Sequence, residues 1–133
     1  MGLTHPQYRV ALRTGRSHMD TIKVEVAGEL EQGQPLYVSC AVVRIPREAI
    51  DEHEIVYRMR RTTAFAERGD LLIVEPRNTA FTGELVVAFR GVNLFLGHWW
   101  AKHGLRELQE HPMESLPGEF EVAGAVTLIV RPS

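Results

Sequence analysis

The sequence has few of the residues that several protein classes depend on. Its one cysteine, Cys40, excludes a disulfide within the chain and favours a reducing compartment. Only two of its 15 basic residues, Lys23 and Lys102, are lysines, which limits any mechanism with a lysine base to two candidates. No apolar run is long enough to cross a membrane, and the arginines within residues 1–18 are not followed by a signal-peptide core. These absences predict a cytoplasmic protein with no membrane partner.

The composition that is present indicates one folded domain. The chain has 133 residues, of which 44% are hydrophobic and 24% charged, as is usual for a globular protein with a single core. A net charge of -2 gives no general attraction to nucleic acid or anionic lipid. Residues 17–19 read Ser-His-Met, a sequence that cloning junctions leave. We therefore expect residues 1–20 to be an N-terminal arm or a vector-derived leader, and residues 21–133 to form the domain.

Two similar segments, 69–76 and 83–90, organise the chain. Each begins with a turn signal and an acidic residue and continues as a run of aliphatic residues, which predicts two buried strands that are neighbours in a sheet. Hydrophobic patterns predict the other strands at 22–26, 36–43, 55–59, 94–100, 105–109 and 120–130, the last bent at Gly124, with one helical turn at 45–50. Many short strands with almost no helical periodicity predict a mainly β domain.

The order of these motifs resembles a known family. Segment 26–36, with its glycines and Pro35, is similar to a cleavage-site loop, and segments 55–59, 69–74, 83–88 and 122–126 are similar to the strands that follow it. Over residues 22–131 the chain resembles the C-terminal domain of the LexA repressor and its stand-alone relative UmuD. These are self-cleaving serine–lysine proteins that share their fold with signal peptidases. The resemblance implies a single LexA/signal-peptidase-like β domain of several short, strongly bent strands.

The catalytic positions that the resemblance implies have changed. Thr62 and Thr63 stand where the family has its nucleophilic serine, and Gly97 stands at the position of the lysine base. Gln32 replaces the small residue expected before Gly33 at the scissile bond. A hydroxyl attacks an amide only when a neighbouring base takes its proton, and glycine supplies none. We therefore expect no catalytic residues and an inactive relative of the peptidases.

Several other readings stay open. A rearranged autopeptidase would use Thr62 or Thr63 with His98 as the base and would cut between Gln32 and Gly33. A structural or ligand-binding protein on the same fold is a further alternative. A serine–lysine pair drawn from Ser39, Ser115, Lys23 and Lys102 matches no motif.

No metal or cofactor is expected. The histidines at 98, 103 and 111 and the glutamates at 107 and 110 are the nearest to a metal-binding set, but their spacing matches no compact ligand pattern. We interpret them as scattered surface residues.

The arginines near the end of segment 55–59 form a local basic cluster. Strand alternation would place Arg58 and Arg60 on one face and Arg61 on the other, which favours a salt-bridged surface over a single anion-binding patch. Because no helix–turn–helix segment precedes the domain, we expect no direct DNA binding.

An interface is expected at the C-terminal strand. Neighbouring residues of a strand face opposite sides, so at least one of Trp99 and Trp100 is predicted to be exposed. The resemblance implies a homodimer through the last strand. The predicted interface residues are Trp99, Trp100, Phe120, Val122, Val126 and Leu128. By the same resemblance the domain is expected to dimerise and to bind a protein partner as a regulatory module of the bacterial DNA-damage (SOS) response.

Overall fold

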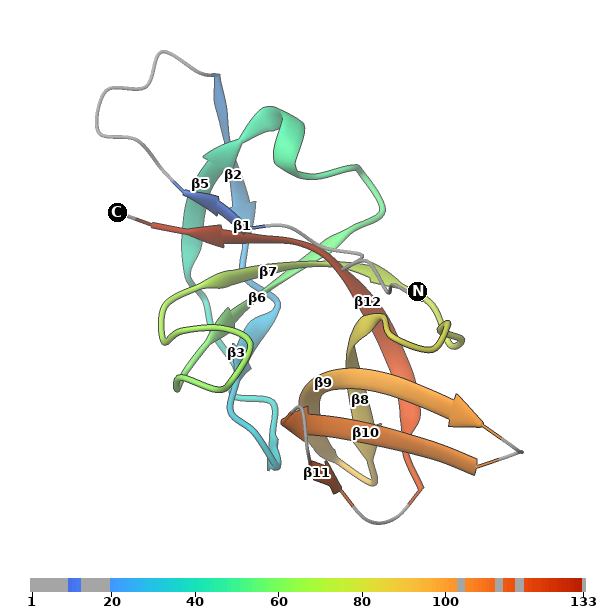
Figure 1. Cartoon of the computed structure of the whole chain (residues 1–133). Coiled ribbons are helices and arrows are strands. Elements are labelled where there is room, and N and C mark those ends of the chain that lie inside the picture. Colours follow the sequence, from blue (N-terminus) through green and yellow to red (C-terminus); the bar gives the residue numbers. More distant parts are fainter. Residues whose placement is uncertain (1–9, 13–19, 103–104, 112–113, 117–118, 133) are drawn as a thin grey trace.

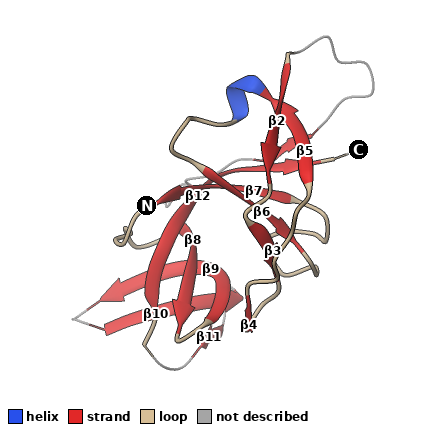
Figure 2. Ribbon diagram, turned by 180° about the vertical axis from the view of Figure 1, so that it is seen from behind, coloured by secondary structure: helices blue, strands red, loops and turns tan. Residues whose placement is uncertain are grey.

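The protein is built almost entirely of β-strands (Figure 1). The computed structural model describes residues 10–12, 20–102, 105–111, 114–116 and 119–132. Within these residues ten strands form one strongly bent sheet and two form a small separate sheet (Figure 2), so the prediction of a mainly β domain is confirmed. The strands are β1 (Val10–Leu12), β2 (Thr21–Glu25), β3 (Gly28–Leu30), β4 (Gln34–Pro35), β5 (Val42–Pro46), β6 (Ile55–Met59), β7 (Leu71–Pro76), β8 (Leu85–Arg90), β9 (Asn93–Lys102), β10 (Leu105–His111), β11 (Glu114–Leu116) and β12 (Glu121–Arg131).

The helical turn predicted at 45–50 is confirmed as a single turn of 3₁₀ helix, η1 (Arg47–Ala49). It follows Pro46, whose ring fixes its φ at the value the first turn of a helix needs. In the part of the chain that the structure describes, no helix is long and apolar enough to span a bilayer.

The central strand of the large sheet is β12, and its position corrects one prediction. The segments 69–76 and 83–90 become β7 and β8 as expected, but they are not neighbours, because β12 lies between them. Both run antiparallel to β12, β7 along residues 124–130 and β8 along residues 121–125. β7 and β8 therefore run parallel to each other. Parallel strands that are direct neighbours need a crossover of a dozen or more residues, and only residues 77–84 join β7 to β8. Instead, β7 pairs with one edge of β12, and residues 77–84 lead the chain to the other edge, where β8 pairs.

The strand predicted at 36–43 is also wrong in its position. Only a single bridge, between Glu29 and Tyr37, forms there, and the strand β5 starts at Val42. The side chain of Val38 is 91% exposed. The pairing with β3 stops after this one bridge, whereas β5 pairs with β2 over five residues and thereby buries Ile45. Pairing therefore decided where the strand formed.

Both faces of β7 and β8 are buried, which explains their nearly continuous aliphatic sequences. In β7, Leu72 and Val74 belong to a core cluster enclosed by the bent sheet. Leu71 and Ile73 face the small β2–β5 sheet on the other side. In β8 the second face packs in a third cluster with Phe95, Trp99 and Phe120. The small sheet thus covers one end of the large sheet.

Three strands begin at the same kind of turn. In each turn an acidic residue donates its backbone N–H to the carbonyl oxygen three residues earlier, and its carboxylate accepts the N–H of that earlier residue. The pairs are Glu54 with Asp51 before β6, Asp70 with Glu67 before β7, and Glu84 with Phe81 before β8. The carboxylates of Asp70 and Glu84 are buried, and each also pairs with an arginine, Arg131 and Arg77 respectively.

Candidate functional site

Residues 32–35 of the segment that resembles a cleavage loop lie along β9. The N–H of Gly33 donates to the carbonyl oxygen of Leu94 at 2.8 Å, and β4 continues the pairing beside Leu94. The side-chain amide of Gln32 imitates a peptide group: its Nε2 donates to the oxygen of Leu96 at 2.9 Å, and its Oε1 accepts the Leu96 N–H at 2.8 Å. Three hydrogen bonds and the β4 pairing, all with one strand, therefore hold residues 32–35 in place.

This docking places two positions of the sequence-based hypothesis on one strand, β9. Gly97 follows Leu96 directly in β9, is buried, and pairs with Val86 of β8. The bond between Gln32 and Gly33 thus lies along β9, the strand in which the resemblance places a lysine base. Gly97 has no side chain, so no group on this residue can take a proton.

The two threonines of the predicted nucleophile region form hydrogen bonds within their own loop. The Thr63 hydroxyl accepts the N–H groups of Phe65 and Ala66 at 3.2 and 3.3 Å. The Thr62 hydroxyl accepts the N–H of Arg68 at 3.0 Å. Threonine hydroxyls commonly stabilise turns in this way. Both oxygens are thereby directed at backbone amides of residues 65–68.

His98 contacts this loop through an aromatic side chain. Its ring packs edge-on against Phe65, with 4.7 Å between centroids and 81° between planes. Burial lowers the pKa of His98 from its usual value of 6.5, because desolvation disfavours the charged ring. Among the hydrogen bonds between described residues, none joins His98 to Thr62 or Thr63. The structure brings the histidine to the threonine loop without forming a base–nucleophile pair.

The arginine cluster is salt-bridged, as the sequence predicted. Arg58 pairs with Glu29 on the neighbouring strand β3, while Arg60 and Arg61 both donate to Glu31. The predicted separation of Arg61 onto the other face is wrong, because β6 ends at Met59 and the alternation of a strand stops there. The hydrogen bond from Arg58 holds the pKa of Glu29 below its usual value.

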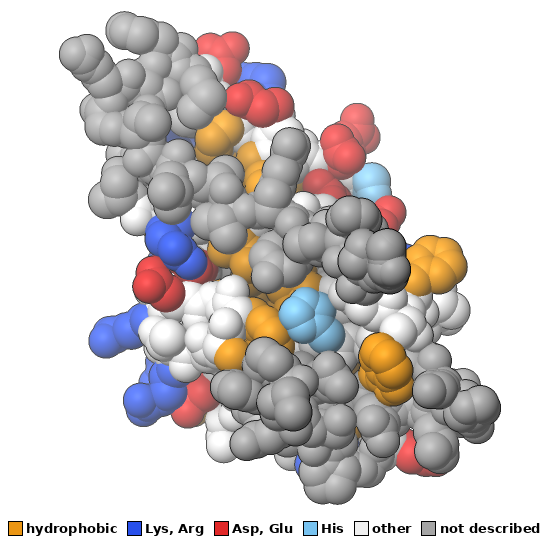
Figure 3. All heavy atoms as spheres, in the orientation of Figure 1, with side chains coloured by type: hydrophobic (Ala, Val, Ile, Leu, Met, Phe, Trp, Pro, Cys, Tyr) orange, Lys and Arg blue, Asp and Glu red, His pale blue; other side chains and the backbone are white. Residues whose placement is uncertain are grey.

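These arginines surround a cavity. It has a volume of about 500 Å³ and is lined by Glu29, Arg58, Arg68 and the intervening loop. Arg60 also stacks over the ring of Tyr37, 4.0 Å from its centroid. Figure 3 shows basic and acidic side chains next to one another along the left side of the face it presents, as expected for a surface of ion pairs.

The predicted interface residues divide between core and surface. Trp100 is 37% exposed and Trp99 is 5% exposed, which confirms that one tryptophan of the pair reaches the surface. The remaining four residues are in the core, three of them because they belong to β12, a central strand with neighbours on both edges. They are Phe120, Val122, Val126 and Leu128. Of the predicted set, Trp100 alone offers a partner substantial side-chain surface.

The other candidate residues give no further site. Ser39 accepts the N–H of Ala41 at 3.1 Å, and none of the hydrogen bonds between described residues joins it to Lys23. Within the described part of the chain, no three histidine, cysteine or acidic side chains group as a metal site would require. His103 lies outside the described residues, as do the side chains of Lys102, Glu107, Glu110, His111 and Ser115.

We predict that Gln32→Ala loosens the docked segment. Loss of the two side-chain bonds should cost about 1–2 kcal/mol and leave the Leu96 N–H without its partner. Hydrogen exchange at the amide of Leu96 should become about tenfold faster. Gln34→Ala is the matched control, since this exposed residue lies in the same segment and pairs through its backbone. Equal exchange at Leu96 in the two variants would contradict the role assigned to Gln32.

Comparisons with known proteins do not assign the chain to a family. No protein-family model matches the sequence, and no curated protein is found as a relative. Function is therefore argued from the geometry above.

Proposed function

We propose that the chain is a catalytically inactive domain of the LexA/UmuD type that acts as a protein-binding regulatory module. The observation that carries this proposal is the docking of residues 32–35 on β9, the strand that contains Gly97. The segment that would be cut lies along the strand that would carry the base, yet the base is missing. Thr62 and Thr63 bind backbone amides, and His98 faces Phe65.

A fixed, uncut segment suits a regulatory role. In a self-cleaving protein the docked segment would be cut, whereas in an inactive domain the same contacts would keep a structural role. The bacterial DNA-damage response is the setting that the resemblance implies, and a protein partner in that response is part of the proposal. The fold by itself does not define the activity.

The chain is expected to stay intact under conditions that promote self-cleavage. Purified protein should be incubated at alkaline pH, where a lysine base would be neutral, and analysed by intact mass spectrometry. A single species of unchanged mass is expected, and a self-cleaving LexA-type protein should be incubated in parallel as the positive control. A product that begins at Gly33 would favour the alternative, an autopeptidase that uses Thr62 or Thr63 with His98.

A homodimer is also part of the proposal, with Trp100 as its exposed anchor. Tryptophan is a frequent anchor of protein interfaces, because it buries a large area and keeps a polar N–H. Sedimentation velocity at micromolar concentration should show a dimer, and Trp100→Ala should shift the protein toward monomer. Val92→Ala, a change at another exposed apolar residue, is the control. A monomer at all accessible concentrations would count against this part of the proposal.

A further inference from the structure

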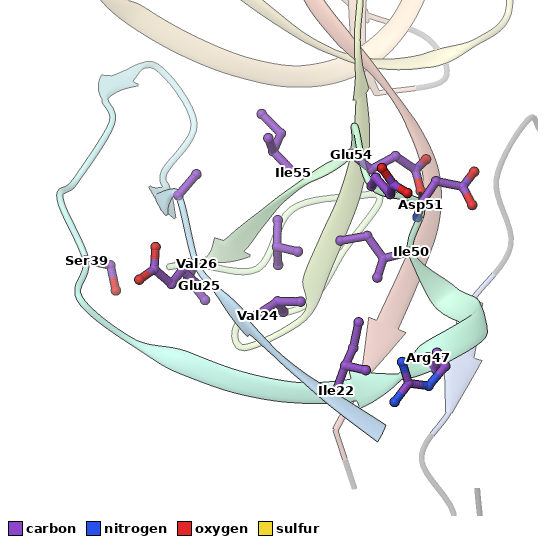
Figure 4. A pocket seen from close by; sticks show the side chains of 13 residues that line it. Ile22, Val24, Glu25, Val26, Ser39, Arg47, Ile50, Asp51, Glu54 and Ile55 are labelled. Atoms are coloured by element: carbon purple, nitrogen blue, oxygen red, sulfur yellow. Dashed lines mark hydrogen bonds between the residues drawn. The ribbon is translucent and has the colours of Figure 1, made fainter. Parts of the chain in front are cut away.

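A cleft lies between β2 and the segment that leads into β6. Its volume is about 750 Å³. Figure 4 shows β2 on one side of the cleft and Ile50 and Ile55 across from it. The apolar part of its lining includes Ile22, Val24, Val26, Ile50, Ile55 and Val56.

The cleft opens where β2 separates from β6. The N–H of Ala27 bonds to the oxygen of Val56 at 2.7 Å, and from Gly28 onward the chain runs beside β6 as β3. Before Ala27 the chain diverges and pairs with β5 instead. A wedge between the two sheets results, with apolar side chains on its walls.

Among the described residues, one edge of β2 is left available to bind another strand. The N–H of Val26 donates to Ala41, and that of Arg47 donates to the oxygen of Asp20. Because bonded pairs alternate in an antiparallel ladder, the peptide groups of Thr21, Lys23 and Glu25 point away from β5. The small sheet consists of β2 and β5 alone, so no described strand pairs with this edge. A free strand edge is a template for strand addition.

The rim of the cleft is acidic. Glu25, Asp51, Glu52 and Glu54 line it, and Arg47 is the one basic residue in the lining. Glu25, Asp51 and Glu52 are exposed, and none of them has an ion-pair partner among the described residues. The rim therefore favours a positively charged ligand over an acidic one.

We propose that the cleft binds an extended segment of a partner protein that carries alternating apolar and basic residues. The segment adds to β2 as a strand, places its apolar side chains on the apolar lining, and presents lysine or arginine to the acidic rim. This mode combines backbone hydrogen bonds for affinity with alternate side chains for selectivity. Five residues along Thr21–Glu25 would span about 16 Å at the usual rise of a strand. The inference rests on the protein-binding part of the proposed function and names the chemistry of the partner.

Charge is tested first, by fluorescence anisotropy of a labelled hexapeptide of alternating valine and lysine. Saturable binding is expected, and a valine–glutamate hexapeptide should not bind. The double variant Asp51→Lys with Glu52→Lys should weaken binding at least about tenfold. The double variant Glu119→Lys with Glu121→Lys makes the same change in net charge at exposed residues around the start of β12 and should bind as the unaltered protein does.

Strand addition is tested separately from charge. Lys23→Pro removes an outward N–H from the edge and leaves the β2–β5 bonds, because proline is tolerated at such positions. This variant should lose binding, and so should a hexapeptide with N-methyl groups at alternate amides. Circular dichroism should confirm that each variant is folded.

Three outcomes would overturn the inference. The first is no saturable binding of the valine–lysine peptide. The second is binding that survives both Lys23→Pro and N-methylation, which would mean simple charge attraction. The third is a homodimer that Lys23→Pro dissociates, which would make a second copy of the chain the occupant. The mass-spectrometric test of self-cleavage is independent of these experiments. A failure of peptide binding would leave the proposal of catalytic inactivity unaffected. Cleavage at Gly33 would overturn catalytic inactivity and leave the conclusion on peptide binding unchanged.

Discussion

Asp70→Ala is expected to reduce the free energy of unfolding by about 2–4 kcal/mol, a large share of the stability of a small domain. The Asp70 carboxylate is 1% exposed and accepts two hydrogen bonds from the Arg131 guanidinium, both at 3.0 Å. It also accepts the backbone N–H of Glu67 at 2.8 Å. Removing it leaves the turn before β7 and the end of β12 without their shared acceptor. Arg131 is partly exposed, so water compensates some of the loss.

Urea denaturation measures this effect. The midpoint should fall while the slope stays constant, since the substitution changes stability and not the surface exposed on unfolding. Asp70→Asn retains the side-chain volume and should lie between Asp70→Ala and the unaltered protein. Glu48→Ala is the control, because this exposed residue takes part in no ion pair between described residues, and it should change stability by less than about 0.5 kcal/mol. A similar result for Asp70→Ala and Glu48→Ala would refute the assigned role.

Local patterns were enough to predict most strands, whereas their partners depend on distant parts of the chain. The aliphatic runs of β7 and β8 indicate burial on both faces, and burial on both faces is found. The strand between them is β12, which comes much later in the chain. Nothing in the sequences of β7 and β8 specifies this partner. The strand predicted at 36–43 failed for the same reason: extended character needs a neighbour, and β5 found one at β2.

The turn before β6 was missed because it lacks glycine. Gly69 and Gly83 have φ values of 91° and 95°, the left-handed region that favours glycine, so their turns are visible in the sequence. His53 stands at the corresponding position before β6. An acidic residue immediately before each aliphatic run is common to all three turns and is the signal that would have found the third.

The candidate site was partly visible in the sequence. The absence of a base at Gly97 follows from the sequence once the resemblance is accepted. The docking of Gln32 does not, because an amide side chain that imitates a peptide group leaves no periodic pattern. The acidic-rimmed cleft was also missed, since its lining comes from β2, η1 and the segment before β6, which are separated in sequence. Alternation in 22–26 and the acidic run 51–54 were its only local signals.

Gly124→Ala is expected to destabilise the fold by about 1–3 kcal/mol, because β12 passes between β7 and β8 at this residue. Gly124 pairs with Pro76 on one edge and with Val87 on the other. A β-carbon here would lie 2.5 Å from Cγ1 of Val74 and 2.7 Å from the carbonyl oxygen of Glu75. Val74 is 1% exposed and the oxygen belongs to the backbone, so neither has room to move.

A double-mutant cycle separates this crowding from a general loss of strand stability. Val74→Ala removes the nearer of the two clashing atoms, so the double variant Gly124→Ala with Val74→Ala should lose less stability than the sum of the single variants. Thermal and urea unfolding of the four proteins measure the difference. Strict additivity would mean that close approach at Val74 is not the cause, and the contact with Glu75 would then have to account for the whole effect. A coupling above about 0.5 kcal/mol would instead identify Gly124 as the residue that lets β12 pass from one neighbour to the other.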